Sequence, residues 1–227
     1  MAPAAMRRKS LFLRRLAIER FKACDRDLHA IIPGIFLGSC GAANNKEGIE
    51  ATGVTHVLCV ANNLLDEVKT STATLHLKYL EISIEDKPGC MITEIFPECF
   101  KFIDLALAGG GKVLVHCFQG KSRSSSVVIG YLMNKKGMLF QQSLEFVKSK
   151  RAVIAPNIGF ALQLRKYERY LLGANAASTV HVDRRRARQS EIRGTSQHQV
   201  NSQRTDGKEA QSQPLDNNVH SDQDTPP

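Results

Sequence analysis

The strongest constraint on this chain is a short polar loop between residues that favour a strand and residues that favour a helix. The loop is a Cys-x5-Arg pattern that begins at Cys117 and ends at Arg123. Apolar residues at 113–115 precede it, and the apolar residues of 127–132 that follow it are typical of a helix. Backbone N–H groups at a helix N-terminus point toward a ligand, and the helix dipole favours negative charge. The sequence therefore predicts an anion-binding loop.

Two side chains of this loop can carry out chemistry. Cys117 enters the loop from the strand, where a helix N-terminus and nearby cations stabilise the nucleophilic thiolate near neutral pH. Arg123 closes the loop, and its planar fork can hold two oxygens of a phosphate. Gly120 allows a tight turn, and its neighbours are expected to offer N–H groups to the phosphate: Phe118, Gln119, Lys121 and Ser122. A nucleophile and a phosphate clamp in one loop predict phosphoryl transfer onto sulfur.

The pattern His-Cys-x-x-Gly-x-x-Arg-Ser resembles the signature of the cysteine-based protein tyrosine phosphatases. The flanking sequence is similar to their dual-specificity members, above all to small ones of the plant and protist type. This resemblance covers about residues 28–172 and includes four further motifs in family order: Ile32-Pro33-Gly34-Ile35-Phe36-Leu37-Gly38-Ser39, Gly53-Val54-Thr55-His56-Val57-Leu58, Tyr79-Leu80-Glu81-Ile82 and Pro156-Asn157-Ile158-Gly159-Phe160. The resemblance implies a metal-independent phosphatase that acts on phosphotyrosine and phosphoserine or phosphothreonine through a cysteinyl-phosphate intermediate.

The resemblance also implies a general acid on a loop upstream of the cysteine. Asp86 lies at the family's spacing, in the segment Ile84-Glu85-Asp86-Lys87-Pro88 that follows a predicted strand. We assign Asp86 as the acid that protonates the leaving group and then as the base that activates water. Glu85 is the alternative, and a solvated loop carboxylate is the alternative without a function.

Three more residues of the family pattern have alternative roles. The Ser124 hydroxyl can stabilise the thiolate as sulfur leaves, or it can cap the helix. His116 orders the loop in the family, and adjacent strand residues point to opposite faces, which argues against a Cys–His catalytic pair. Asn157 matches the Pro-Asn motif, which braces the active-site loops, or it simply caps a helix that begins at Ile158.

No metal site and no cofactor are expected. The seven histidines are scattered and the carboxylates do not cluster at ligand spacings. The six cysteines form no Cys-x-x-Cys pattern, and without a secretory signal this favours a reducing compartment, cytoplasmic or nuclear. Most of them are expected to be small buried residues. Cys59 ends a strand predicted to lie beside the catalytic one, so a protective disulfide with Cys117 is an alternative for it.

Strands alternate with helical stretches along the chain, which predicts an α/β three-layer sandwich with a central, mainly parallel sheet, as in protein tyrosine phosphatases. The predicted strands are residues 31–37, 54–60, 74–84 and 112–115. The predicted helices are residues 94–107, 123–134, 141–150 and 158–172. Ligands of such sheets bind beyond the strand C-termini, which is where the Cys117 loop is expected.

Composition divides the chain into a basic N-terminal arm (1–27), a catalytic domain (28–172) and a polar C-terminal tail (173–227) that we expect to be disordered. The net charge is +9, but the excess lies mainly in the arm. The mildly basic domain argues against a nucleic-acid partner. No stretch approaches ~18 consecutive apolar residues, so no transmembrane segment is predicted.

The sequence of the N-terminal arm is compatible with several kinds of partner. Residues 7–13 resemble the docking motif by which mitogen-activated protein kinases hold regulators. Residues 7–22 can also form a basic amphipathic helix of the kind that binds calmodulin or an anionic membrane. Packing on its own domain and a mitochondrial presequence are the remaining alternatives. In the tail, the basic run at 184–188 is either a nuclear import signal or solvated charge.

Phosphorylated proteins are the expected substrates. The domain shows no match to the recognition loop that deepens the pocket of tyrosine-specific members, so a shallow pocket is predicted. The dipeptide Phe118-Gln119 lacks the basic residues of lipid phosphatases, which disfavours a phosphoinositide, and an RNA 5′-phosphate lacks a basic surface in its favour. A non-catalytic phosphoprotein-binding relative is a further alternative, against which Cys117, Arg123 and Asp86 all argue.

Overall fold

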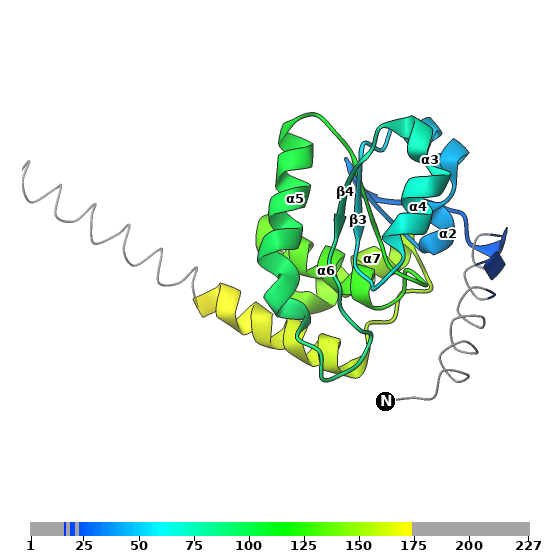
Figure 1. The fold of residues 1–227 in the computed structure, drawn as a ribbon. Coiled ribbons are helices and arrows are strands. Elements are labelled where there is room, and N and C mark those ends of the chain that lie inside the picture. Colours follow the sequence, from blue (N-terminus) through cyan, green and yellow to red (C-terminus); the bar gives the residue numbers. More distant parts are fainter. Residues whose placement is uncertain (1–15, 17–18, 21–22, 174–227) are drawn as a thin grey trace, which may run out of the picture. The chain divides into compact units, whose positions relative to one another are not determined.

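The computed structural model describes residues 16, 19–20 and 23–173 (Figure 1). Residues 175–227 are a unit separate from the domain and lie wholly outside the described residues. The predicted kinase-docking motif, most of the predicted basic helix at 7–22, the presequence, the tail and its basic run also lie outside them. These features stay predictions.

A five-stranded sheet in the order β1-β2-β5-β3-β4 forms the centre of the domain. The β1–β2 pair is antiparallel, and the β2–β5, β5–β3 and β3–β4 pairs are parallel. The strands are β1 (His29–Ile32), β2 (Ile35–Gly38), β3 (His56–Cys59), β4 (Lys78–Glu81) and β5 (Val113–His116). This confirms the predicted mainly parallel sheet, with β5 in the middle.

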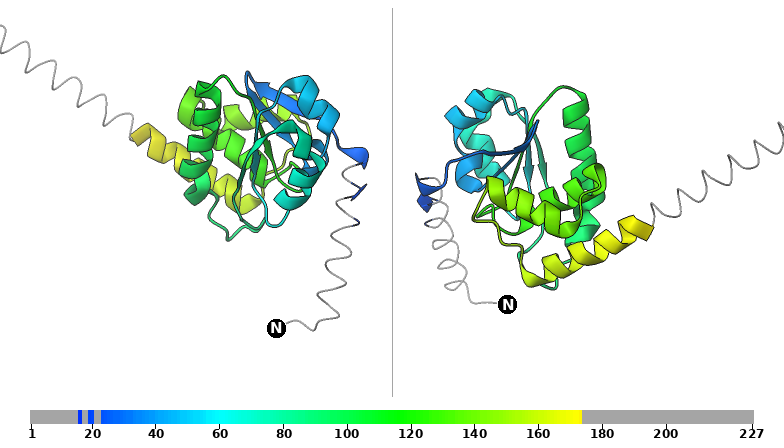
Figure 2. Two further views of the ribbon diagram at one scale, coloured as in Figure 1. Left: turned by 45° about the horizontal axis from the view of Figure 1, so that its top comes forward. Right: turned by 180° about the vertical axis from the view of Figure 1, so that it is seen from behind.

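Helices cover both faces of the sheet, and the alternation of side chains along β5 accounts for the two layers (Figures 1 and 2). Val113 and Val115 enter the larger core with the long helices, whereas Leu114 enters a smaller core with the short ones. The larger layer consists of α5 (Phe96–Ala108), α6 (Arg123–Lys136), α7 (Phe140–Lys150) and the helix at 158–173, drawn in yellow. The smaller layer consists of α2 (Cys40–Ala43), α3 (Lys46–Thr52) and α4 (Leu65–Ser71). The predicted α/β sandwich is thus confirmed.

Several predicted boundaries are wrong for local reasons. The single strand predicted at 31–37 is two strands, β1 and β2, because Pro33-Gly34 forms a turn in which Gly34 has φ +82°. The strand predicted at 74–84 is reduced to β4 by a 3-10 turn at Ala73–Leu75. The helix predicted at 94–107 begins as a 3-10 turn at Ile92–Ile95. The short helices α2, α3 and α4 were not predicted, since four to seven residues carry too little periodicity.

The helix that follows the Cys117 loop matches its prediction closely. α6 begins at Arg123 and ends where Gly137 takes a left-handed conformation, with φ +64°. Ten of its residues are buried, from Ser124 to Met133, so it lies in the middle of its layer. Within the described part of the chain, none of the helices is both long enough and apolar enough to cross a membrane.

Candidate active site

Cys117 follows β5 directly, at the C-terminal end of the four parallel strands, and the loop from Cys117 to Ser122 leads into α6. The turn in the loop requires glycine at position 120. Gly120 has φ +65°, and a Cβ atom there would lie 2.4 Å from the carbonyl oxygen of Gly38. The loop is held in place because it follows the central strand β5 and packs closely against β2.

The loop turns its backbone carbonyls toward the surrounding protein. The Phe118 carbonyl accepts a hydrogen bond from the Cys40 N–H at 3.0 Å, and the Lys121 carbonyl accepts one from the Ala155 N–H at 2.8 Å. All peptide bonds described are trans, and in a trans peptide the C=O and the following N–H point in opposite directions. The N–H groups of Gln119 and Ser122 therefore point away from these contacts, as an anion-binding loop requires.

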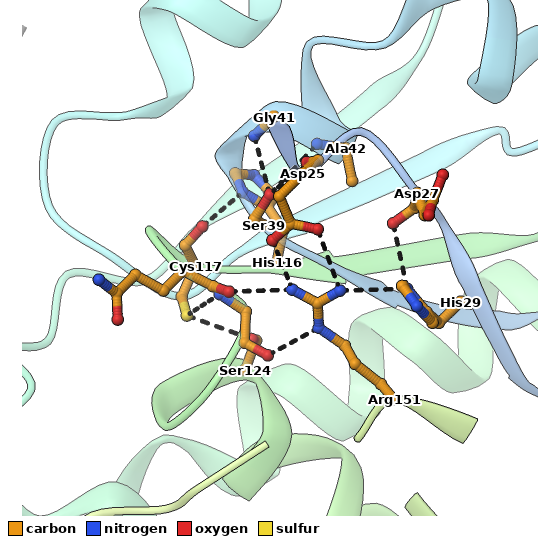
Figure 3. Close-up of polar contacts among 12 residues, drawn as sticks. Asp25, Asp27, His29, Ser39, Gly41, Ala42, His116, Cys117, Ser124 and Arg151 are labelled. Carbon is orange, nitrogen blue, oxygen red and sulfur yellow. Dashed lines mark hydrogen bonds and ion pairs between the residues drawn. The ribbon is translucent and has the colours of Figure 1, made fainter. Parts of the chain in front are cut away.

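The Cys117 sulfur lies at the focus of the loop and is almost fully buried, with 1% of the residue exposed. Two donors reach it: the Gly120 N–H at 3.3 Å and the Ser124 hydroxyl at 3.2 Å (Figure 3). Ser124 is the second residue of α6 rather than its N-cap, which is Ser122. The capping alternative for Ser124 is therefore wrong, and its hydroxyl is free to stabilise negative charge on sulfur.

Arg123 presents its guanidinium beside the same loop. Its Nη1 donates to the Ile84 carbonyl at 3.2 Å, which ties the side chain to the segment before the predicted acid. Its Nε is buried and has no hydrogen-bond partner among the described residues. Buried N–H donors are rarely left unpaired in proteins, so this group is suited to an oxygen of a bound phosphate.

Asp86 lies next to Arg123 and is oriented by two donors. The Ser122 hydroxyl at 2.6 Å and the Asn157 side-chain amide at 2.8 Å both donate to Asp86 Oδ1. Asp86 Oδ2 faces Arg123 Nε at 3.8 Å. The alternative acid, Glu85, instead forms an exposed ion pair with Lys87 at 2.6 Å. Of the two carboxylates, the structure brings Asp86 to the loop.

The helix at 158–173 holds the segment that carries Asp86. Asn157 donates to Asp86 and, through its Oδ1, accepts the Phe160 N–H at 3.0 Å, so bracing and capping occur together in this residue. A Cβ atom at Gly159 would lie 2.0 Å from the Pro88 carbonyl oxygen, and Gln163 donates to the Cys90 carbonyl at 2.8 Å. Three contacts from one helix N-terminus thus fix the acid loop.

His116 is fully buried at the end of β5, with its Nδ1 3.3 Å from the Cys117 carbonyl oxygen. The pKa of His116 is lowered to about 4, mainly by burial and to a smaller extent by the Arg123 charge, whereas the Cys117 contact raises it. The imidazole is therefore neutral at physiological pH. A neutral His116 can donate Nδ1–H to the Cys117 carbonyl and so support the loop.

Cys59 and Cys117 lie in one buried cluster, together with Cys40. Strand β3, which Cys59 ends, pairs with β5 as predicted, and Cys59 stands opposite His116. All three cysteines are free thiols. Burial raises the pKa of the Cys59 thiol far above its ordinary value, and Glu81 raises it further, so Cys59 is a neutral thiol. The disulfide with Cys117 stays a prediction.

A hollow of about 240 Å³ opens beside Arg123 and is lined by Ala61, Leu64 and Phe118. Its walls are apolar, which suits the carbon skeleton of a phosphorylated side chain. A second hollow, of about 550 Å³, lies between α5, α6 and the helix at 158–173, and none of the predicted site residues lines it. Within residues 23–173, no three histidine, cysteine or acidic side chains form a group that could hold a metal ion.

Arg151, which contacts the loop, and its counter-ion Asp25 were not predicted from the sequence. Arg151 donates to the Gln119 and Gly120 carbonyls and pairs with Asp25, as Figure 3 shows. Asp25 and Arg151 are 126 residues apart in the chain, so no local pattern joins them. The only signal was a basic residue at the end of a predicted helix, just before the Pro-Asn motif. The hydrogen bond from the Ser122 side chain to Asp86 was not predicted from the sequence either.

The comparisons with known proteins all point to the same family. Residues 35–170 match the model of the dual specificity phosphatase catalytic domain. Over 148 residues the chain is 41% identical to dual specificity protein phosphatase 1B of Arabidopsis thaliana, which covers 65% of this chain and 86% of that protein. It is 37% identical over 146 residues to the serine/threonine/tyrosine-interacting protein of Mus musculus, covering 63% of this chain and 65% of that protein.

Solved structures agree. The human tyrosine phosphatase-like serine/threonine/tyrosine-interacting protein superimposes with a TM-score of 0.60 and 36% identity, over 65% of this chain and 99% of that chain. Human DUSP28 gives a TM-score of 0.57 and 32% identity, over 64% of this chain and 95% of that chain.

The sheet topology and the placement of the Cys117 loop are those of a protein tyrosine phosphatase-like fold. The chain belongs to the dual specificity phosphatase family. It is accordingly a protein phosphatase of the tyrosine and serine/threonine class, as the sequence resemblance implied.

Proposed function

We propose that this chain hydrolyses phosphotyrosine and phosphoserine or phosphothreonine in proteins through a cysteinyl-phosphate intermediate at Cys117. The observation that carries the proposal is the setting of the Cys117 sulfur. It accepts hydrogen bonds from the Gly120 N–H and the Ser124 hydroxyl, beside the Arg123 Nε, which has no hydrogen-bond partner among the described residues. Such a setting stabilises an anion on sulfur and receives a phosphoryl group next to it.

In the first step, the Cys117 thiolate attacks phosphorus and the bond from phosphorus to the leaving oxygen breaks. Arg123 and the inward N–H groups of the loop stabilise the charge on the equatorial oxygens. Asp86, as the carboxylic acid, gives its proton to the leaving oxygen. Because Oδ1 is held by Ser122 and Asn157, Oδ2 is the oxygen suited to carry that proton.

In the second step, water attacks phosphorus and the phosphorus–sulfur bond breaks. Asp86, now a carboxylate, takes a proton from the water, and inorganic phosphate leaves. Sulfur departs as a thiolate, so the hydrogen bond from Ser124 strengthens as the negative charge develops. The carboxyl group of Asp86 thus serves both steps, and the enzyme returns to its starting protonation state.

The pocket supports a substrate class that includes both short and long phosphorylated side chains. The hollow beside Arg123 is small and open, with Leu64 and Phe118 on its walls. A phenyl ring can pack against these walls, and nothing in the hollow's size excludes the shorter serine or threonine. Among possible protein substrates, mitogen-activated protein kinases are proposed because residues 7–13 resemble their docking motif.

The test is phosphate release from a peptide phosphorylated on both threonine and tyrosine, in EDTA and reductant, by wild type and by Cys117→Ser. The proposal expects release from both residues by wild type and from neither by the variant. Binding of the peptide without release by wild type would instead support the phosphoprotein-binding alternative. Release that survives in Cys117→Ser would rule out sulfur as the nucleophile.

A further inference from the structure

Arg151 is a buried cation that the proposed reaction does not use. It is the C-cap residue of α7, and only 2% of its surface is exposed. A buried guanidinium is costly unless its charge is paired and its donors are satisfied. Arg151 lies against the catalytic loop, as Figure 3 shows, and its burial there indicates that it has a specific role.

Four of the five N–H donors of Arg151 have a carbonyl or carboxylate acceptor. Nε donates to the Gly120 carbonyl at 3.1 Å, and Nη2 donates to the Gln119 carbonyl at 3.0 Å and to Asp25 Oδ2 at 2.7 Å. Nη1 donates to Asp25 Oδ1 at 3.2 Å and contacts His29 Nδ1 at 3.1 Å. Arginine has five donors and no acceptor, so the contact with His29 is a hydrogen bond only in the tautomer in which Nδ1 accepts, and the Asp27 carbonyl, 3.3 Å from the same nitrogen, favours the other tautomer. Arg151 consequently acts through the loop rather than on substrate.

The two carbonyls that Arg151 holds belong to consecutive peptide groups of the loop. In a trans peptide, a carbonyl fixed on one side directs the next N–H to the other side. The Gln119 carbonyl therefore sets the Gly120 N–H, which points at the Cys117 sulfur at 3.3 Å. The Gly120 carbonyl sets the Lys121 N–H in the same way. One side chain thus orients two donors of the anion-binding loop.

Asp25 completes the arrangement from the segment that precedes β1. Its carboxylate is the bidentate counter-ion of Arg151, and its carbonyl accepts the Ser39 hydroxyl at 2.8 Å. Ser39 in turn caps α2, which begins with Cys40, and the Cys40 N–H holds the Phe118 carbonyl. The residues around Asp25 thereby hold the carbonyls of three consecutive loop residues: Phe118, Gln119 and Gly120.

We propose that Arg151 and Asp25 form a positioning pair that orients the phosphate-binding N–H groups of the catalytic loop. The segment before the sheet is thus part of the catalytic apparatus. This proposal rests on the proposed function where it is tested by kcat/KM. The measurement of phosphate affinity does not depend on turnover.

The test uses Arg151→Lys and Asp25→Asn in the full chain, with titration of inorganic phosphate as the probe. Lysine keeps the charge but lacks the planar fork, so it cannot hold two carbonyls and a carboxylate in the same geometry. Arg151→Lys should weaken phosphate binding about tenfold and lower kcat/KM for an aryl phosphate about 10²-fold, the scale expected for misplaced catalytic groups. Asp25→Asn should act in the same direction with a smaller effect, since the amide keeps one acceptor oxygen.

Arg26→Gln is the matched control. Arg26 adjoins Asp25 and also ties the segment to the domain, through Asn45 and Glu47 at 2.9 Å, but it does not touch the loop. This variant should lose its two side-chain contacts with Asn45 and Glu47 and retain wild-type phosphate affinity and kcat/KM. Thermal unfolding of all variants separates stability from positioning.

A purely structural role for Arg151 would lower the melting temperature and leave the phosphate affinity of the folded molecules unchanged, and that result would overturn the proposal. Equal losses of affinity in Arg26→Gln and Asp25→Asn would overturn it as well. If wild type binds phosphate but does not hydrolyse esters, the proposed function fails while the binding comparison still decides this inference. Absence of phosphate binding by wild type contradicts both.

Discussion

The first half of the catalytic loop and its C-terminal end are supported by different chemistry. The carbonyls of Gln119 and Gly120 rest on Arg151, whose counter-ion Asp25 is mostly buried. Ser122, at the other end of the loop, binds the side chain of Asp86, which is 35% exposed and is shared with Asn157. The first support grips the backbone from within the protein, whereas the second joins side chains at the edge of the pocket.

This difference matches the tasks of the two ends. Donors that bind a phosphate must already be aimed before the substrate arrives, because reorganisation during the reaction would cost free energy. The acid must reach leaving oxygens of several kinds of phosphorylated side chain, so it has to lie where substrate enters. Changes at the Arg151 support should thus alter phosphate binding, and changes at the Asp86 support should alter proton transfer.

The largest effect is expected at Arg123, which closes the loop and lies beside Asp86. Arg123→Lys keeps a positive charge but loses the fork, and it should lower kcat about 10³-fold, at the upper end of the range for loss of one oxyanion donor. Phosphate binding should weaken at the same time, since the guanidinium contacts the anion in the ground state too. Stopped-flow or steady-state kinetics with an aryl phosphate measures both. A loss confined to kcat, with phosphate affinity intact, would contradict the assignment.

The next largest effect is expected from a change in the general acid, Asp86, alone. Asp86→Asn should lower kcat about 10²-fold for a substrate with a poor leaving group, because the amide has no proton to give. The loss should shrink for an activated aryl phosphate, whose oxygen needs little protonation. Glu85→Gln is the matched control, as Glu85 pairs with Lys87 away from the loop. Greater loss in Glu85→Gln than in Asp86→Asn would reverse the assignment.

A smaller effect should come from Asn157→Asp. The new carboxylate can still accept the Phe160 N–H and keep the helix cap, but it cannot donate to Asp86 Oδ1. We expect kcat to fall about tenfold while phosphate affinity stays unchanged, as for an acid that is present but misplaced. The ratio of the two losses is the measurement. If phosphate affinity falls as much as kcat, the two ends of the loop are not functionally separate.

The smallest effect concerns stability rather than activity. The pKa of buried His116 in the folded protein is about 4, below its ordinary value of 6.5, so the unfolded chain takes up a proton first as the pH falls. Stability from this residue is complete above about pH 6.5 and is lost toward pH 4. Urea unfolding should show that wild type loses about 2 kcal/mol more than His116→Gln between pH 7.5 and pH 5.

Replacement of the exposed His76 by Asn should leave that pH dependence as in wild type, which serves as the control. A His116→Gln protein with the same loss of stability as wild type would show that His116 is not the group that binds the proton.

The sequence predicted best what is specified locally. Strand β5, the loop after it and α6 follow one another within residues 113–136, so apolar runs, Gly120 and Gly137 were enough to place them. The hairpin of β1 and β2 was misread because Ile31 to Leu37 is mostly apolar and the Pro33-Gly34 turn was overlooked. In both cases the residues that determine the local structure lie within a short stretch of the chain.

Contacts between distant segments could not be predicted in the same way. The bidentate pair of Asp25 and Arg151 forms only when the end of α7 packs beside the segment before β1. The hydrogen bond from Ser122 to Asp86 joins the catalytic loop to the acid loop 36 residues upstream. Composition and periodicity describe single elements, and these contacts depend on how the elements are placed in the sheet.

The most direct test of the account is a rapid-quench reaction of Asp86→Asn with an activated aryl phosphate, followed by mass spectrometry of the peptide that contains Cys117. The variant still accepts the phosphoryl group from a good leaving group but lacks the base for hydrolysis, so the intermediate should accumulate. The account predicts a burst of phenol and one phosphoryl group on Cys117. Phosphate release without any phosphoryl group on Cys117, or a phosphoryl group on another residue, would contradict it.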